Sequence, residues 1–252
     1  MEGALLTAQS IGKSFWRTEV LKAATLWCDA GCINALMGRN GSGKTTLLKI
    51  AAGRLRADYG VVHFAGEVFE RPRARTLGRR GLFYLPDRGL LSTMGSVRDH
   101  LDVVCRCFGT DGLEETAETL GISRVLDVRT HKLSGGERRR AELAMMLLRK
   151  PTCVLADEPM AGLTPRERTV VAEALRTLAR EGTGVVVTGH DVPDLFEVAD
   201  HVTWMVAGTT HQIGTPAEAR KHDQFVQEYL GPGGAPDDSV SGPGLHGDSE
   251  GE

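Results

Sequence analysis

A glycine-rich segment at residues 38–46 carries the residues best suited to chemistry in this chain. It fits the pattern G-x-x-x-x-G-K-[ST], in which backbone N–H groups surround the phosphates of a nucleotide. Its members are Gly38, Arg39, Asn40, Gly41, Ser42, Gly43, Lys44, Thr45 and Thr46. In such a phosphate loop, Lys44 neutralises the outer phosphates and Thr45 places its hydroxyl on Mg²⁺. The segment therefore predicts a nucleotide site rather than a simple glycine turn before a helix.

A second glycine turn lies at residues 133–137, which read Leu-Ser-Gly-Gly-Glu. Ser134 and Glu137 form a capping-box pattern that opens a helix. Gly135 and Gly136 fall in its first turn, where each glycine costs about 1 kcal/mol relative to alanine. A helix N-terminus with bare N–H groups attracts anions, so these glycines favour close approach of a phosphate over a mere helix cap.

Two acidic residues follow a largely apolar run at residues 152–156. An acid at the end of a buried strand can hold Mg²⁺ directly or through water, a role that suits Asp157. Glu158 would face another way and is the predicted base that polarises an attacking water. Without the phosphate loop, a solvated acidic turn would be the better interpretation of this pair. His190 follows another apolar run at residues 184–188, where a lone histidine is usually only a loop residue.

The elements that must position these residues follow from the apolar runs. Four such runs predict buried strands, at residues 32–37, 81–85, 153–156 and 184–188, the last three of them parallel. The first run, the phosphate loop and the helix-forming residues 46–52 follow one another in the order that the motif requires. Capping boxes at Ser96–Asp99 and Thr164–Glu167 predict two more helix starts. The fold class is α/β, with a helix-rich stretch between about residues 90 and 150.

The two glycine turns together resemble those of the ATP-binding cassette (ABC) ATPases, over about residues 4–230. The resemblance implies a P-loop NTPase core with a mostly parallel sheet, an antiparallel β subdomain and an inserted helical subdomain at about 90–150. Residues 231–252 are rich in glycine and proline and almost free of apolar residues, so we expect an acidic, disordered tail.

The resemblance also implies roles for single residues. Ser134, Gly135, Gly136 and Glu137 would bind the γ-phosphate of an ATP held by a second cassette, in a homo- or heterodimer that sandwiches two ATPs head to tail. His190 would contact the γ-phosphate and help to hold the attacking water. Phe15 would stack on adenine, with Trp16 as its possible substitute.

Two positions depart from the family pattern. Asp87 stands where the family has glutamine; it could still bind Mg²⁺ but adds negative charge, which Arg88 would offset. We therefore expect slower or differently coupled hydrolysis. Thr164 stands where the family has aspartate, and it can cap the following helix but supplies no charge. Communication between the two nucleotide sites is in doubt on this ground.

Composition places few further limits on function. The chain has 252 residues and a net charge of −3, but residues 231–252 hold five acids and no Lys or Arg, so the rest is near neutral. This gives no reason to expect a nucleic acid partner. No uncharged apolar run approaches the roughly 18–20 residues that cross a bilayer, and no signal peptide is apparent. Basic runs at residues 71–80 and 138–140 suggest a solvated face, or contact with lipid head groups or an acidic partner.

Three functions remain open from the sequence. The first is the ATP-hydrolysing subunit of an ABC transporter, cytoplasmic and peripheral on the inner face of the membrane, working through separate integral membrane subunits. Residues 158–165 and 228–231 look like the cassettes of the branched-chain amino acid and lipopolysaccharide transport groups. The second is a soluble ABC protein that acts in cluster assembly. The DNA-maintenance type would need a very long coiled-coil insertion, for which the roughly 90 residues between the two glycine turns leave no room, and the translation type generally carries two cassettes. The third is a regulatory subunit that binds ATP but barely hydrolyses it.

Overall fold

The computed structural model describes residues 4–230, and the tail predicted at 231–252 lies outside them. The first sheet has four strands in the order β2-β1-β4-β5, and all of its neighbouring strands are antiparallel. Its strands are β1 (Leu6–Phe15), β2 (Thr18–Cys28), β4 (Tyr59–Phe64) and β5 (Glu67–Phe69). This is the antiparallel β region that the family resemblance implied.

The second sheet has six strands in the order β10-β9-β3-β8-β7-β6, parallel except for β10 at one edge. They are β3 (Ile33–Met37), β6 (Leu82–Leu85), β7 (Cys153–Ala156), β8 (Gly184–Gly189), β9 (His201–Val206) and β10 (Thr209–Gly214). All four strands predicted from apolar runs are present, with ends that shift by one residue at most. The predicted mostly parallel sheet is confirmed.

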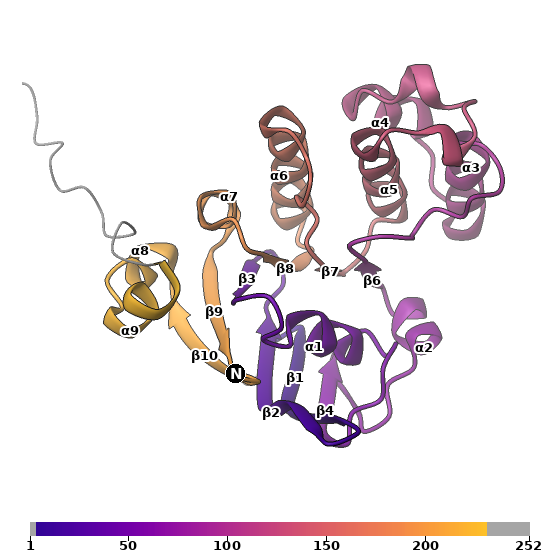
Figure 1. Ribbon diagram of the computed structural model, residues 1–252. Coiled ribbons are helices and arrows are strands. Elements are labelled where there is room, and N and C mark those ends of the chain that lie inside the picture. The colour runs from indigo at the N-terminus through magenta and orange to yellow at the C-terminus, as the bar shows by residue number, and fades with distance from the viewer. Residues whose placement is uncertain (1–3, 231–252) are drawn as a thin grey trace, which may run out of the picture.

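The two faces of this sheet belong to different cores. Side chains alternate along a strand, so in β3 Ala35 and Met37 pack into one core while Leu36 packs into the other. The core around Leu36 includes α1 (Lys44–Ala51), which contacts the antiparallel sheet on its other side. The opposite face is covered by α6 (Pro165–Arg180) and α7 (Val192–Val198) (Figure 1). Burial on both faces explains why these strands are almost wholly apolar.

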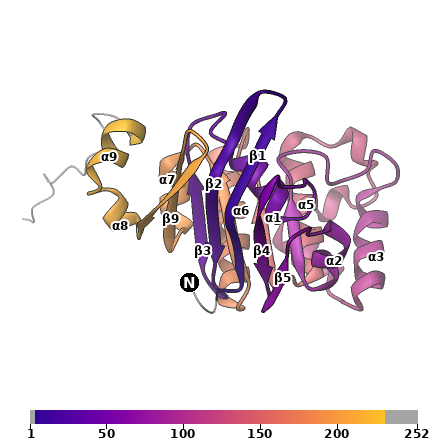
Figure 2. The same ribbon diagram turned by 90° about the horizontal axis from the view of Figure 1, so that it is seen from below.

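A helical segment is inserted between β6 and β7, within the predicted range. It contains α3 (Val97–Phe108), α4 (Leu113–Thr119), the 3₁₀ turns η1 (Ser123–Val125) and η2 (Thr130–Lys132), and α5 (Gly135–Arg149). Figures 1 and 2 show it at one end of the molecule, opposite the C-terminal turns. Those are α8 (Pro216–Ala219), α9 (Asp223–Phe225) and the π-helical turn η3 (Val226–Leu230), while the short α2 (Ala74–Arg79) precedes β6.

Capping boxes begin the helices whose starts the sequence predicted. Ser96, Ser134 and Thr164 each accept a hydrogen bond from the backbone N–H three residues later, and the acid at that later position accepts one in return. Thr215 and Glu218 form a fourth box at α8. Local chemistry therefore determines these starts. None of the helices within residues 4–230 combines the length and apolar character needed to cross a bilayer.

The box at α3 predicts a loss of stability in acid. The backbone N–H of Ser96, and then its hydroxyl, lower the pKa of Asp99 below its ordinary value of 3.8. A carboxyl with a depressed folded-state pKa contributes stability above its ordinary pKa, and this is lost as the pH falls through the folded-state value. We expect the Asp99→Asn variant to lose stability less steeply below about pH 4, in guanidinium unfolding between pH 7 and 2.5. Asp102→Asn, on the same helix but outside the box, is the control, and equal slopes for wild type and Asp99→Asn would contradict the prediction.

Candidate nucleotide-binding and catalytic site

The phosphate loop joins the carboxyl end of β3 to the start of α1, as its motif requires. At Gly38 a Cβ would lie 2.4 Å from the carbonyl oxygen of Met205, so only glycine fits there. Gly43 is the N-cap of α1 and has a φ of 109°, a conformation that favours glycine. The glycines of the motif are therefore needed for the loop itself, before any ligand binds.

Lys44 is folded onto its own loop. Its Nζ donates hydrogen bonds to the carbonyl oxygens of Gly38 at 2.7 Å and Arg39 at 3.3 Å, and the residue is 6% exposed. Burial lowers the pKa of Lys44, and the negative charges of Glu158 and Asp157 oppose that shift. An ammonium has three donors, so one remains for an anion in the adjoining cavity.

That phosphate cavity has a volume of about 440 Å³. It is lined by Val20, Asn40, Gly41, Gly43, Lys44, Thr45, Thr46, Asp87 and Glu158. Most predicted phosphate-loop residues thus meet two of the predicted acids, although Asp87 and Glu158 are distant from the loop in sequence.

Asp157 is the centre of a hydroxyl network beside this cavity and is 1% exposed. Its Oδ1 accepts from the hydroxyls of Thr45 and Thr188, both at 3.0 Å, and its Oδ2 accepts from Tyr84 Oη at 3.0 Å. Burial, and then the charge of Asp157, raise the pKa of the Tyr84 phenol. The sequence pointed to Thr45 and Asp157 but missed Tyr84 and Thr188. Their only signal was a hydroxyl near the carboxyl end of each predicted strand.

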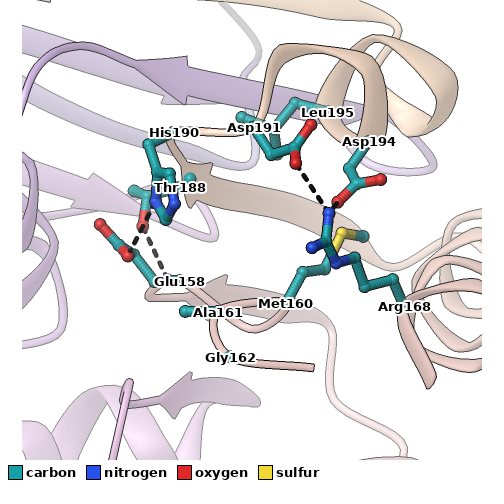
Figure 3. A pocket seen from close by; sticks show the side chains of 11 residues that line it. Glu158, Met160, Ala161, Gly162, Arg168, Thr188, His190, Asp191, Asp194 and Leu195 are labelled. Atoms are coloured by element: carbon teal, nitrogen blue, oxygen red, sulfur yellow. Dashed lines mark hydrogen bonds and ion pairs between the residues drawn. The ribbon is translucent and has the colours of Figure 1, made fainter. Parts of the chain in front are cut away.

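Glu158 points away from this network, as its position one residue further predicted. It has a φ of 45°, a left-handed conformation that is strained for glutamate, and strain of this kind clusters at functional sites. Its backbone N–H donates to Thr188 Oγ1 at 2.9 Å, and its Oε2 lies 3.4 Å from Nδ1 of His190 (Figure 3). The structure therefore brings together the two predicted catalytic residues, which come from the ends of β7 and β8.

An arginine missed by the sequence analysis secures the segment that follows His190. Arg168, in the first turns of α6, lies 2.7 Å from Asp191 and 2.9 Å from Asp194 (Figure 3). Its Nε also donates to the carbonyl oxygen of Leu163 at 3.1 Å. These contacts tie the loop before α6 to the chain just after His190.

The glycine turn at residues 134–137 does not contribute to the lining of the phosphate cavity. Ser134 Oγ is engaged with Glu137, donating to its Oε2 at 2.7 Å and accepting from its backbone N–H at 3.3 Å. A Cβ on Gly136 would lie 1.6 Å from Glu167 Oε1, whereas at Gly135 none of the described residues comes within 4 Å. The space next to Gly136 is thus filled by the Glu167 carboxylate of the same chain, whereas the space next to Gly135 is empty in the structure described.

One expectation about arginines is wrong. Arg139 departs from the predicted solvated face, because it is 5% exposed, and its Nη2 donates to the Asp87 carbonyl oxygen at 2.6 Å. Arg88 and Asp87 are both exposed and form no ion pair within residues 4–230, so the offset of the Asp87 charge by Arg88 stays a prediction. Residues 138–140 lie on α5, and of these three arginines the middle one, Arg139, is buried.

The two aromatics considered for adenine stacking lie at the end of β1 and in the turn that follows. Phe15 is 41% exposed and has Lys13 Nζ 5.4 Å from its ring centroid, and Trp16 is fully exposed. Neither lines the phosphate cavity. Both rings remain accessible to a ligand.

Comparison with known proteins establishes the family. The family model described as "ABC transporter" matches residues 21–161. The lipopolysaccharide export system ATP-binding protein LptB of Haemophilus influenzae is 30% identical over 235 residues, covering 90% of this chain and 98% of that protein. This chain belongs to the ABC transporter family. LptB of Escherichia coli K12 is also 30% identical, with the same coverage.

Solved structures agree on the fold. The ADP conformation of MJ1267, an ATP-binding cassette of an ABC transporter, superposes with a TM-score of 0.79 at 22% identity, covering 90% of this chain and 99% of that one. The first of the three functions considered from the sequence is confirmed: the chain is the ATP-binding, ATP-hydrolysing subunit of a transporter whose membrane components are separate.

The hydroxyl network gives a test by substitution. Tyr84→Phe removes one hydrogen bond to the buried carboxylate of Asp157, and such bonds to charged groups contribute about 1.5–3 kcal/mol. We expect a fall of that size in the free energy of unfolding, measured in urea. Tyr59→Phe makes the same chemical change on a half-exposed ring and should leave stability within about 0.5 kcal/mol of wild type. An equal effect of both variants would count against the network.

Proposed function

We propose that the phosphate cavity binds ATP with Mg²⁺ and that Glu158 and His190 act on the water that attacks the γ-phosphate. The observation that carries the proposal is the hydrogen bond of 3.0 Å between Thr45 and Asp157, because it brings two oxygen ligands together beside Lys44. Mg²⁺ prefers oxygen ligands and is usually held by one or two carboxylates together with substrate phosphates. Asp87, on the cavity wall, would supply a third oxygen ligand of this kind.

In this proposal the chain's own groups share the work. Backbone N–H groups of residues 38–46 and Lys44 hold the phosphates, and Phe15 or Trp16 stacks on adenine. Bound Mg²⁺ would neutralise charge that develops on the phosphates. Glu158 accepts a proton from the attacking water, and His190 fixes the orientation of the Glu158 carboxylate, since the two side chains lie 3.4 Å apart.

We further propose that Ser134, Gly135, Gly136 and Glu137 bind the γ-phosphate of an ATP held by a second cassette, in a homo- or heterodimer. Their separation from the chain's own phosphate cavity supports this, because a second anion site at a helix N-terminus needs another nucleotide. Residues 4–230 would then form one ABC ATPase domain, with the helical subdomain at about 90–150 carrying the second site.

The cellular location that we propose for the chain follows from its proposed membrane partners. We propose a cytoplasmic, peripheral position on the inner face of the membrane, reached through integral membrane transport subunits and without nucleic acid. Relatives include an ATP-binding protein for lipopolysaccharide export and one named for Fe(3+) ion import, FbpC 2 of Rhodococcus jostii, which is 32% identical. The proposal therefore extends to ATP-driven transport, with no cargo assigned.

Blocking hydrolysis tests the dimer. Glu158→Gln removes the base but keeps the shape, so ATP should bind without being hydrolysed and hold two chains together. We expect the purified variant, alone or with its companion cassette, to change from monomer to dimer when Mg·ATP is added, measured by light scattering after gel filtration. The same protein with Lys44→Ala should remain monomeric because it cannot hold the phosphates. A nucleotide-loaded Glu158→Gln protein that stays monomeric with every companion would refute the sandwich.

Replacing the unusual acid tests the metal site. Asp87→Gln removes a negative charge next to the triphosphate and also a charged Mg²⁺ ligand. We expect turnover to rise and the Mg²⁺ concentration for half-maximal turnover to increase several-fold, measured by phosphate release. Arg88→Gln, which alters the exposed neighbour, should change neither value. Unchanged Mg²⁺ dependence and turnover in Asp87→Gln would exclude a role for Asp87.

A further inference from the structure

A buried ion pair joins the helix that begins with Ser134–Glu137, here called the signature helix (α5), to the loop that follows β6. Arg139 Nη1 lies 3.1 Å from Glu142 Oε2, and the two side chains are only 6% and 2% exposed. The loop consists of residues 86–91 and includes Asp87 on the wall of the phosphate cavity. The pair therefore joins the helix that carries the proposed second anion site to the loop that lines the chain's own nucleotide site.

The guanidinium binds the start of this loop through its backbone. Arg139 Nη1 donates to the carbonyl oxygen of Pro86 at 2.9 Å, and Nη2 donates to that of Asp87 at 2.6 Å. Burial raises the pKa of the Glu142 carboxyl, and the charge of Arg139, followed by the backbone N–H groups of Leu91 and Leu90, opposes that shift. The ion pair thus holds the start of loop 86–91 against the signature helix.

The neighbouring arginines on the same helix do something else. Arg138 donates to the carbonyl oxygen of Thr130 at 2.6 Å, and Arg140 donates to that of Gly136 at 3.3 Å. Burial lowers the pKa of Arg139, and the charges of Glu142, Asp87 and Asp157 oppose that shift. Among the three arginines, the middle one is thus linked both to the loop and to the acids of the metal site.

Stability alone does not account for this arrangement. Burying two charges costs hydration free energy, and their mutual attraction offsets this cost only in part. Replacing a buried ion pair by apolar residues of similar volume is often neutral or stabilising. What a fork of fixed guanidinium donors supplies is geometry, since it holds two successive carbonyl oxygens at defined positions. Any shift of the signature helix would therefore move the backbone of Asp87.

We propose that Arg139, braced by Glu142, is a positioning residue that places the Asp87 carboxylate for Mg·ATP and carries movements of the signature helix to it. The inference rests on the proposed function, because it needs the phosphate cavity to bind nucleotide with Mg²⁺. It supplies a route between the two anion sites that does not use Thr164, the residue that lacks the family's charge. Closure of a second cassette on Ser134 would then alter metal affinity at the chain's own site.

The test measures binding rather than turnover. In the full chain carrying Glu158→Gln, binding of a fluorescent ATP analogue is followed at increasing Mg²⁺, with and without Arg139→Lys. Lysine keeps the charge but loses the fork, so we expect the Mg²⁺ concentration for half-maximal binding to rise about three- to tenfold. Glu142→Gln should shift it in the same direction, because it loosens the guanidinium without changing the loop.

A double-mutant cycle separates positioning from a general structural effect. In an Asp87→Ala background the carboxylate that Arg139 places is gone, so Arg139→Lys should change the Mg²⁺ requirement less than twofold. Arg138→Lys, on the same helix but bonded to Thr130, is the matched control and should behave as the parent. Thermal unfolding of each protein confirms that it is folded, and Glu142→Gln replaces Arg139→Lys if the latter is not.

The outcomes are distinct. A shift that depends on Asp87 supports the proposal. An unchanged Mg²⁺ requirement in both Arg139→Lys and Glu142→Gln overturns it, and so does an equal shift with and without Asp87, which would show a merely structural role. If the Glu158→Gln parent itself binds no nucleotide in the presence of Mg²⁺, the proposed function fails and this inference with it.

Discussion

The active region depends on the buried carboxylate of Asp157. Three hydroxyls converge on it, from Thr45 in α1, Tyr84 in β6 and Thr188 in β8. Burying a polar group costs free energy unless it is hydrogen-bonded, so these bonds hold the helix and the strands in one relative position. That position sets the distance between the phosphate loop and Glu158, and hence the shape of the phosphate cavity.

The two proposed anion sites are separate in the molecule, and polar contacts connect the elements that carry them. The phosphate loop and its acids lie at the carboxyl ends of the parallel strands, where α/β sheets commonly bind ligands. The turn at Ser134 begins a helix of the inserted segment and takes no part in that cavity. The Arg139–Glu142 pair and the Arg168 contacts link α5 and α6 to the loops around the predicted catalytic residues.

Agreement between sequence and structure is best where the signal is local. The strand at Cys153–Ala156 and the capping boxes at Ser96 and Thr164 depend on residues within a few positions of one another. The prediction of a solvated Arg139 was wrong because its burial depends on residues that are remote in the chain. Three consecutive arginines look alike in a sequence, and only packing of α5 against loop 86–91 decides that the middle one is buried. Tyr84 and Thr188 were missed because their partner lies on another strand.

The sequence by itself determined the phosphate loop, the apolar strand before it, the capped helix starts and the acidic pair Asp157–Glu158. Each of these features is carried by residues that are contiguous or a few positions apart. Only the tertiary structure decided which side chains meet: Glu158 with His190, Glu167 with Gly136, and Arg139 with the Asp87 backbone. These contacts join residues that are remote in the chain. They form only when whole helices and strands have the right relative orientation. The packing of the two hydrophobic cores sets that orientation, and a local sequence pattern does not encode it.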